Sequence, residues 1–402
     1  MTTTSAWTRT IIISFLAFIG LGVSAGLLGL AWPSMQKQFN LPLDGVNSLY
    51  LVQTAAYSTA SFYIGRLMAR YGSGNILLLG MVLMSACLFG TALSGTWALV
   101  ILFTLIAGFG SGLVDAGLNL YVATYHSAQQ MNFLHASFGI GITFGPLIMT
   151  FALQQSLGWQ MGYAITGTVL ISIILMLVLT RGAWRREGFA TADNKPVRRV
   201  SIGATLRRPV VWFSMATFLA YVGLEIGIGQ WAYTLLTQSR QVSAEVAGPW
   251  VSIYWGAFTG GRILWGVIAN RFAIDKVLRY CMLGALVGAI LFWWDPVNLV
   301  GLLGLIVIGF SQAPIFPMLM AGTPQRVGVE HAENAISVQM AAVGVGTAIL
   351  PGLIGTIGKN LGLEMMAATF VIMAIVVFIF HELSLAGAAQ RVTPVSGELP
   401  TK

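Results

Sequence analysis

The chain has 402 residues, of which 56% are apolar and 8% are charged, and its 21 Lys and Arg residues outnumber its 13 Asp and Glu residues. Soluble domains carry about 25% charged residues. This chain has too few charged residues to cover the surface of a water-soluble globule, so its composition excludes that class of protein. The mean hydropathy of +0.81 and the net charge of +8 indicate membrane spans joined by basic loops rather than a nucleic-acid-binding protein.

About 20 apolar residues cross a bilayer as a helix, and the chain holds twelve such stretches. We therefore expect an all-α integral membrane protein with spans at roughly 10–33, 45–70, 74–94, 97–122, 131–155, 160–181, 209–236, 247–270, 275–294, 297–320, 333–358 and 361–382. The stretch from Ile11 to Pro33 is longer than a signal-peptide core and lacks an A-x-A cleavage site, so we expect it to be retained as span one.

The longest polar segment runs from Arg181 to Arg208 and carries eight basic and two acidic residues. It predicts an N-terminal six-helix bundle (1–181), a cytoplasmic basic linker (182–208) and a C-terminal six-helix bundle with a short tail (209–402). Of the 21 Lys and Arg residues, 18 fall on the side of the termini and the linker. Because basic residues collect in cytoplasmic loops, we expect a multi-pass protein of the cell (inner or plasma) membrane with both termini in the cytoplasm.

The two halves of the chain repeat each other. Three pairs of segments align at offsets of 203, 201 and 205: FLAFIGLGVSAG (15–26) with FLAYVGLEIGIG (218–229), GRLMARYG (65–72) with GVIANRFA (266–273), and G-x-G-x4-P at 139–146 with the same pattern at 344–351. Six spans separate the equivalent segments, so the copies have the same orientation, as in parallel repeats related by an axis along the membrane normal.

Twelve spans, this duplication, the long basic loop and the short G-x4-R-[YF] loops after spans two and eight resemble the major facilitator superfamily. The resemblance covers the whole chain and implies that superfamily's fold and alternating access. In the superfamily an Asp usually precedes the Arg of these loops, whereas here Ala69 precedes Arg70 and Asn270 precedes Arg271. The resemblance implies that Arg70 and Arg271 control the cytoplasmic gate.

Several segments are similar to the fucose/galactose/glucose–proton symporter group: VDAGLN in span four, NFLHASFGIG-x3-GP in span five, YVGLE in span seven, WGAFTGGRILWG in span eight and GFSQAPIFP in span ten. This resemblance implies proton-coupled uptake of a monosaccharide or related polyol, with sodium as the alternative coupling ion. The rival interpretation is proton-antiport efflux of a drug or amphipathic metabolite. Its span-five signature ends in two glycines, where this chain has Met149 and Thr150. A non-transporting membrane scaffold or sensor is a third functional class, and it gives no function to the acidic residues within the spans.

Charged groups are costly inside a membrane, so Asp115, Glu225 and Arg262 are functional candidates. Asp115 has Asn119 on the same helix face, which suits a proton carrier; the alternative is a structural hydrogen bond through Asn119, Asn132 or His135. The repeat aligns Glu225 with Gly22, so one copy alone acquired an acid. With Gln230 and Trp231 following it, Glu225 suits substrate or proton binding, and a salt bridge is the alternative.

Arg262 fits gating through a carboxylate or snorkelling to the interface, and His135 fits either a proton relay or a structural hydrogen bond. Other polar residues lie in mid-span and line a central cavity or join helices: Gln53, Tyr57, Tyr254, Gln312 and Gln339.

Cys87 and Cys281 each lie in an apolar run and fit small core residues. The sequence has no Cys/His grouping with metal-ligand spacing, no Walker lysine and no hydrolytic triad. We therefore expect a transporter rather than an enzyme, with no cofactor, metal or nucleic acid. The expected partners are a sugar-like small molecule, a coupling ion and the lipid bilayer, and we expect a monomer.

Overall fold

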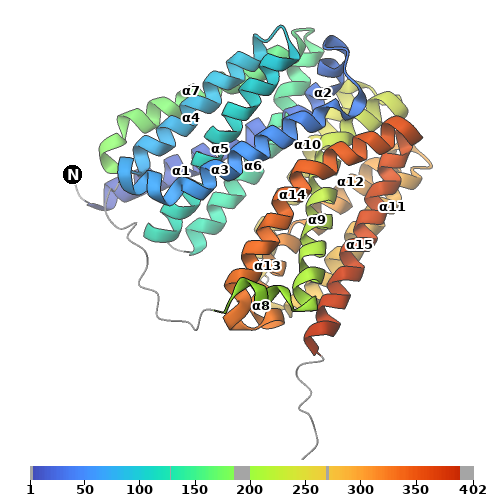
Figure 1. The fold of residues 1–402 in the computed structure, drawn as a ribbon. Coiled ribbons are helices and arrows are strands. Elements are labelled where there is room, and N and C mark those ends of the chain that lie inside the picture. The colour runs from blue at the N-terminus through green and yellow to red at the C-terminus, as the bar shows by residue number, and fades with distance from the viewer. Residues whose placement is uncertain (1–2, 127, 185–199, 269–270, 390–402) are drawn as a thin grey trace, which may run out of the picture.

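The computed structural model of the protein describes residues 3–126, 128–184, 200–268 and 271–389, and within these ranges it contains helices and short connections but no strand (Figure 1). Most of the predicted linker and the C-terminal tail lie outside the described residues. In chain order the elements are α1 (Thr3–Ala25), α2 (Leu28–Gln38), η1 (Leu43–Val46), α3 (Asn47–Tyr71), α4 (Ser73–Ala92), α5 (Trp97–Tyr125), α6 (Ala128–Gln154), α7 (Gly158–Leu179), η2 (Arg181–Ala183), α8 (Ile202–Leu206), α9 (Pro209–Thr234), the π-turn η3 (Leu235–Ser239), α10 (Ala244–Ile268), α11 (Ile274–Trp294), α12 (Asn298–Gln312), α13 (Ile315–Val327), α14 (Val329–Leu361) and α15 (Glu364–Ala389).

Ten segments of the described chain are long and apolar enough to cross a membrane. They correspond to ten of the twelve predicted spans. The other two, spans two and eight, are α3 and α10, which have 25 residues each. Both are long enough to cross a bilayer, but polar and glycine residues lower their hydropathy. They occupy equivalent places in the two repeats and both pack against the opposite half.

Spans one and ten are each built from two helices. In span one, α1 ends at Ala25 and α2 begins at Leu28, so Gly26 lies in the break. Span ten breaks between Gln312 and Ile315, where Pro314 has no backbone N–H to continue the helix. Interrupted helices of this kind often line the binding sites of membrane transporters, because the backbone groups freed at the break can bond a ligand.

The helices form two groups, α1–α7 and α9–α15, which we call the first and second groups. Figure 1 shows them as two bundles that meet near α2, α10 and α14 and diverge toward the side where α8 lies. The main contacts between them are α6 with α10, α3 and η1 with α14, and α2 with α9. The arrangement is therefore closed on the side remote from the linker.

Glycines produce the same helix contacts in both groups. A Cβ atom at Gly108 would lie 2.7 Å from the Gln53 carbonyl oxygen, and one at Gly309 would lie 2.4 Å from the Tyr254 carbonyl oxygen. Both residues of the second contact are 201 positions after those of the first, which is the offset of one aligned pair of segments. Close approach at a residue without a side chain thus packs α3 on α5 and α10 on α12.

Substitution at Gly141 is expected to destabilise the first group. A Cβ atom there would lie 2.1 Å from the Ile19 carbonyl oxygen, so α1 and α6 would have to separate. We expect Gly141→Val to lower the free energy of unfolding by about 3 kcal/mol, the upper range for overpacking, measured as thermal stability in detergent. The control is Gly65→Ala, since no atom lies within 4 Å of a Cβ atom at Gly65. Equal melting temperatures for the two variants would contradict this packing.

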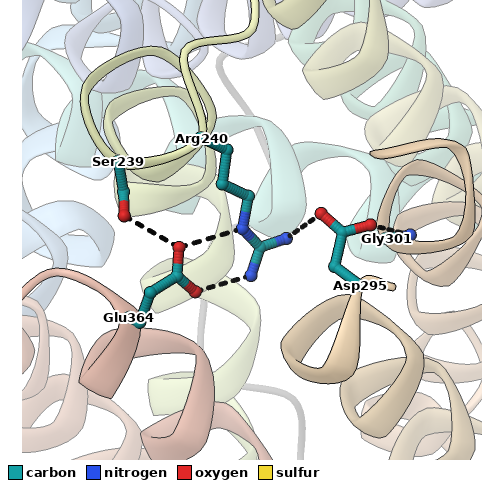
Figure 2. Close-up of polar contacts among 5 residues, drawn as sticks. All are labelled: Ser239, Arg240, Asp295, Gly301 and Glu364. Atoms are coloured by element: carbon teal, nitrogen blue, oxygen red, sulfur yellow. Dashed lines mark hydrogen bonds and ion pairs between the residues drawn. The ribbon is translucent and has the colours of Figure 1, made fainter. Parts of the chain in front are cut away.

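The end of η3, the turn that continues α9, is fixed by an ion network (Figure 2). Arg240 Nη1 lies 2.9 Å from Asp295 Oδ2 and Arg240 Nη2 lies 2.8 Å from Glu364 Oε2. Ser239 donates to Glu364 Oε1 at 2.8 Å, and the Gly301 backbone N–H donates to Asp295 Oδ1 at 2.8 Å. The network ties the end of η3 to α11, α12 and α15, so these elements of the second group are held together at this end.

Removing the Arg240 guanidinium is expected to cost about 3 kcal/mol of unfolding free energy. The side chains of Arg240 and Asp295 are only 7% and 6% exposed, so Arg240→Ala leaves a buried carboxylate without its cation. The matched control is Arg279→Ala, which breaks an ion pair with Glu382 whose side chains are 47% and 33% exposed. Exposed pairs contribute about 0–1 kcal/mol. Thermal melts that show the same loss for both variants would contradict the prediction.

Candidate functional site

The acid of the first group, Asp115, is held by donors from two helices. Asn119, one turn further along α5, donates from Nδ2 to Asp115 Oδ1 at 2.9 Å. The Tyr57 hydroxyl of α3 donates to Asp115 Oδ2. Both carboxylate oxygens are therefore hydrogen-bonded in a half-buried position. This arrangement lowers the cost of a carboxylate within a span and fixes its orientation.

Glycines on α5 bring Tyr57 within reach of Asp115. A Cβ atom at Gly112 would lie 2.6 Å from the Tyr57 carbonyl oxygen. Together with Gly108, which contacts Gln53 one turn earlier, this glycine lets α3 approach α5 closely. The small residues in span four thus have a direct structural consequence, because they set the position of the phenol that contacts the acid.

The acid of the second group, Glu225, is half-buried in α9. Tyr221, one turn earlier, and Arg262 of α10 both interact with its carboxylate. The Arg262 guanidinium lies over the Phe258 ring, 4.3 Å from the ring centroid, and its Nε atom is buried without a partner in the described chain. Opposite charges near each other, with a phenol and an aromatic face, reduce the cost of ionised groups within the span.

Gln312 lies where span ten breaks and joins this cluster. Its Oε1 atom accepts from the Tyr254 hydroxyl at 2.9 Å, and its backbone carbonyl accepts from the Tyr221 hydroxyl at 3.2 Å. The Tyr254 hydroxyl also lies 3.3 Å from the Glu225 carbonyl oxygen. Gln312 is fully buried, and its Nε2 atom has no partner in the described chain. The broken helix, the amide, two phenols and an acid therefore meet at one place.

This cluster offers the groups that a polyhydroxylated ligand needs. A carboxylate and an amide oxygen accept hydrogen bonds from hydroxyl groups, and the amide N–H and phenols donate them. Trp255 lies beside Tyr254, with ring centroids 4.8 Å apart, and adds an aromatic face. In the first repeat, Gly22 is the equivalent of Glu225. Ser61 is the equivalent of Arg262, at the offset of 201. The charged pair therefore occurs in the second group only.

Of the two residues expected beside Glu225, Gln230 bonds across to the first group and Trp231 bonds to α14 within the second group. Gln230 Oε1 accepts from the Tyr50 hydroxyl of α3 at 2.9 Å. Trp231 Nε1 donates to the Pro351 carbonyl of α14 at 2.9 Å, and its ring is fully buried. Both side chains are therefore engaged within the protein, on the side remote from the linker.

Gln339 is also separate from the cluster. Its Nε2 atom donates to Ser214 Oγ at 2.6 Å, and its Oε1 atom accepts from Thr323 Oγ1 at 3.1 Å. These bonds join α14 to α9 and α13 within the second group. The side chain of Gln339 is buried, and both ends of its amide are hydrogen-bonded to neighbouring helices in this structure.

The residues expected to gate or relay protons are dispersed. His135 is exposed, packs edge-on against Phe18 with ring centroids 5.8 Å apart, and interacts electrostatically with Arg262 across the two groups. Arg70 is exposed in the last turn of α3, and Arg271 is exposed after α10. The Asn132 side chain and Asn270 lie outside the described residues.

Tyr221 and Tyr50, which contact the candidate residues, were not singled out from the sequence. Tyr221 precedes Glu225 by four positions, so helical spacing alone could have identified it as a same-face partner. Tyr50 contacts Gln230 across 180 positions of sequence, and no local pattern points to that pairing.

Cys87 and Cys281 are buried free thiols. In the described part of the chain, no group of three or more His, Cys, Asp and Glu side chains could hold a metal ion.

Comparison with known proteins places these features in a family. The model of the family described as "Major Facilitator Superfamily" matches residues 11–338 and 232–397. The chain is 22% identical over 357 residues to the glucose/mannose transporter GlcP of Bacillus subtilis, covering 86% of this chain and 87% of GlcP. It is 23% identical over 378 residues to the mouse sodium-dependent glucose transporter 1A, covering 85% and 88%.

Solved structures share the fold. A mutant of the nucleoside transporter NupG superposes with a TM-score of 0.74 at 14% identity, covering 94% of this chain and 99% of that chain. FucP, a Major Facilitator Superfamily transporter in the outward conformation, superposes with a TM-score of 0.61 at 16% identity, covering 94% and 99%. The all-helical membrane fold predicted from the sequence is confirmed.

Proposed function

The chain belongs to the Major Facilitator Superfamily and is a multi-pass secondary transporter, and from this premise we propose that it takes up a monosaccharide or related polyol together with a proton. The names of two relatives, the glucose/mannose transporter GlcP and the sodium-dependent glucose transporter 1A, support a sugar substrate. The second name keeps sodium as the alternative coupling ion.

The observation that carries the proposal is the buried amide of Gln312 at the break in span ten, whose Nε2 atom has no partner in the described chain. Tyr254 bonds to this side-chain amide and Tyr221 bonds to the Gln312 backbone carbonyl, which together hold Gln312 beside the Glu225 segment. An unpaired buried donor is costly, and a sugar hydroxyl or ring oxygen would satisfy it. We assign substrate binding to Glu225, Gln312 and Tyr254.

Asp115 is the proposed proton carrier. Its donors Tyr57 and Asn119 stabilise the ionised carboxylate, and the Tyr57 hydroxyl can turn to accept a hydrogen bond from the protonated acid. Gln53 of α3 packs against α5, the helix that carries Asp115.

The basic-residue distribution supports a cytoplasmic location for the termini and linker. The closed side would then face outward, and the site would open to the cytoplasm in this conformation. We propose that the carrier works as a monomer.

The test uses purified protein in liposomes that contain a pH-sensitive dye. Hexoses are added one at a time with and without sodium, and lipophilic cations are then added against an imposed proton gradient. Sugar-dependent acidification of the interior without sodium is the expected result. Sugar uptake that needs sodium and leaves the dye unchanged would replace the proton by sodium. Discharge of the proton gradient by lipophilic cations alone would replace uptake by drug efflux.

A further inference from the structure

The two groups are joined on the side remote from the linker by a hydrogen bond whose acceptor, the Gln230 amide, is buried. Tyr50, in the first turn of α3, donates from its hydroxyl to Gln230 Oε1 of α9 at 2.9 Å. Gln230 is 2% exposed, and its Nε2 atom has no partner in the described chain. The bond is thus sheltered from water, and its loss would leave a buried amide unpaired at both ends.

A second, more exposed layer lies nearer the surface. The carboxylate of Asp44, in η1, accepts from Thr356 Oγ1 at 3.2 Å and lies 3.3 Å from Lys359 Nζ, both on α14. The Lys359 side chain is 46% exposed and that of Asp44 is 26% exposed. Water screens an ion pair of this kind, so the buried layer contributes more to holding the groups together.

Backbone packing supports both layers. A Cβ atom at Gly29 of α2 would lie 2.4 Å from the Gly229 carbonyl oxygen of α9. One at Gly352 of α14 would lie 2.2 Å from Asn47 Cγ of α3. These glycines let the helices of the two groups touch at the end where Tyr50 meets Gln230, and the same helices must separate there if a substrate is to enter from that side.

The linker side of the same helices differs. A Cβ atom at Gly65 of α3 or at Gly344 of α14 would have no atom within 4 Å. His135 of α6 is exposed there although Arg262 of the other group is near enough to act on it electrostatically. Among the described residues, the two groups are thus held together by specific contacts on the side remote from the linker, whereas these two glycines of the linker side have open space beside them.

We propose that Tyr50 is a positioning residue of the transport cycle, whose hydrogen bond to Gln230 holds the carrier closed on the side remote from the linker. Gln230 lies five residues after Glu225 on α9, and the network around Arg240 anchors the end of that helix to the second group. Movement of α9 as part of the second group therefore breaks the bond when that side opens. The inference rests on alternating access between the groups and not on the substrate or the coupling ion.

The experiment measures thiol accessibility in purified, ligand-free protein. Cysteine at position 47, packed against Gly352, reports opening of the closed side, and cysteine at position 135 reports the linker side. The native Cys87 and Cys281 are buried, so a bulky hydrophilic maleimide reacts mainly with the reporters. We expect Tyr50→Phe to raise labelling of Asn47→Cys about fivefold, the effect of one hydrogen bond of about 1 kcal/mol, and to lower labelling of His135→Cys.

Two comparisons make the result specific. Gln230→Ala should act like Tyr50→Phe, and the double variant should show no further increase, because both changes break the same bond. Tyr63→Phe, an exposed tyrosine on the same helix, should leave both rates unchanged. Unchanged labelling at position 47 in both Tyr50→Phe and Gln230→Ala, or an increase at both reporters, would overturn the proposal. Since no ligand is added, a failed sugar-transport assay leaves this outcome interpretable.

Discussion

Replacement of Glu225 by glutamine is expected to reduce sugar exchange across liposome membranes by about 100-fold while the protein stays folded. Glutamine keeps the size of the side chain but replaces an acceptor oxygen with a donor and removes the charge that faces Arg262. Hydrogen bonds to a charged group are worth about 1.5–3 kcal/mol, which corresponds to a loss of about 10- to 150-fold. Exchange of labelled sugar at equal concentrations inside and outside measures this effect without any proton gradient.

The matched control for this variant is Glu245→Gln, which changes an exposed carboxylate in the first turn of α10. It should exchange sugar at the wild-type rate. Melting temperatures of both variants within a few degrees of wild type would exclude misfolding as the cause. A Glu225→Gln protein that exchanges sugar normally would remove Glu225 from the substrate site.

Replacement of Asp115 by asparagine is expected to abolish accumulation of sugar while exchange continues. With one proton per sugar, a gradient of about one pH unit can support about tenfold accumulation, since each unit is worth about 1.36 kcal/mol. Asparagine can still bond to Tyr57 and Asn119 but cannot carry a proton. We therefore expect the ratio of internal to external sugar to fall from about ten to about one, measured with an imposed pH gradient.

Tyr57→Phe provides the comparison, because it removes the donor to Asp115 Oδ2 and leaves the carboxylate in place. Accumulation should persist in that variant at a reduced rate. If Asp115→Asn still accumulates sugar to the wild-type ratio, the proton is carried elsewhere, and His135 or Glu225 becomes the carrier to test. Loss of exchange in Asp115→Asn would instead indicate a role in substrate binding.

Span positions follow from the sequence because apolar length and composition are properties of one segment. The interruption of span ten is different. Pro314 lies at the break, yet Pro146 and Pro351 lie inside the continuous helices α6 and α14. A proline interrupts a helix in a membrane only where the neighbouring helices bond the freed backbone groups in another way. At Gln312 the hydroxyl of Tyr221 supplies that bond, and its position depends on tertiary packing.

The pairing of Asp115 with Asn119 could be derived from helical spacing, whereas Tyr57 required the distance between α3 and α5. The expected grouping of Glu225 with Gln230 and Trp231 shows the opposite case. Positions five and six residues apart on a helix point about 140° and 120° away from the first position, at about 100° per residue. The structure accordingly directs Gln230 to Tyr50 and Trp231 to Pro351, while Glu225 meets Tyr221 and Arg262.

The two repeats share their helix packing but not the acid at position 225. A Cβ atom at Gly22, the counterpart of Glu225, would lie 2.2 Å from the Phe138 carbonyl oxygen, so the first group uses this position to press α1 against α6. The second group has a half-buried carboxylate there. An acid introduced at Gly22 would therefore separate two helices instead of creating a second site. The two groups are therefore not interchangeable, because only the second has room for a carboxylate at this repeat position.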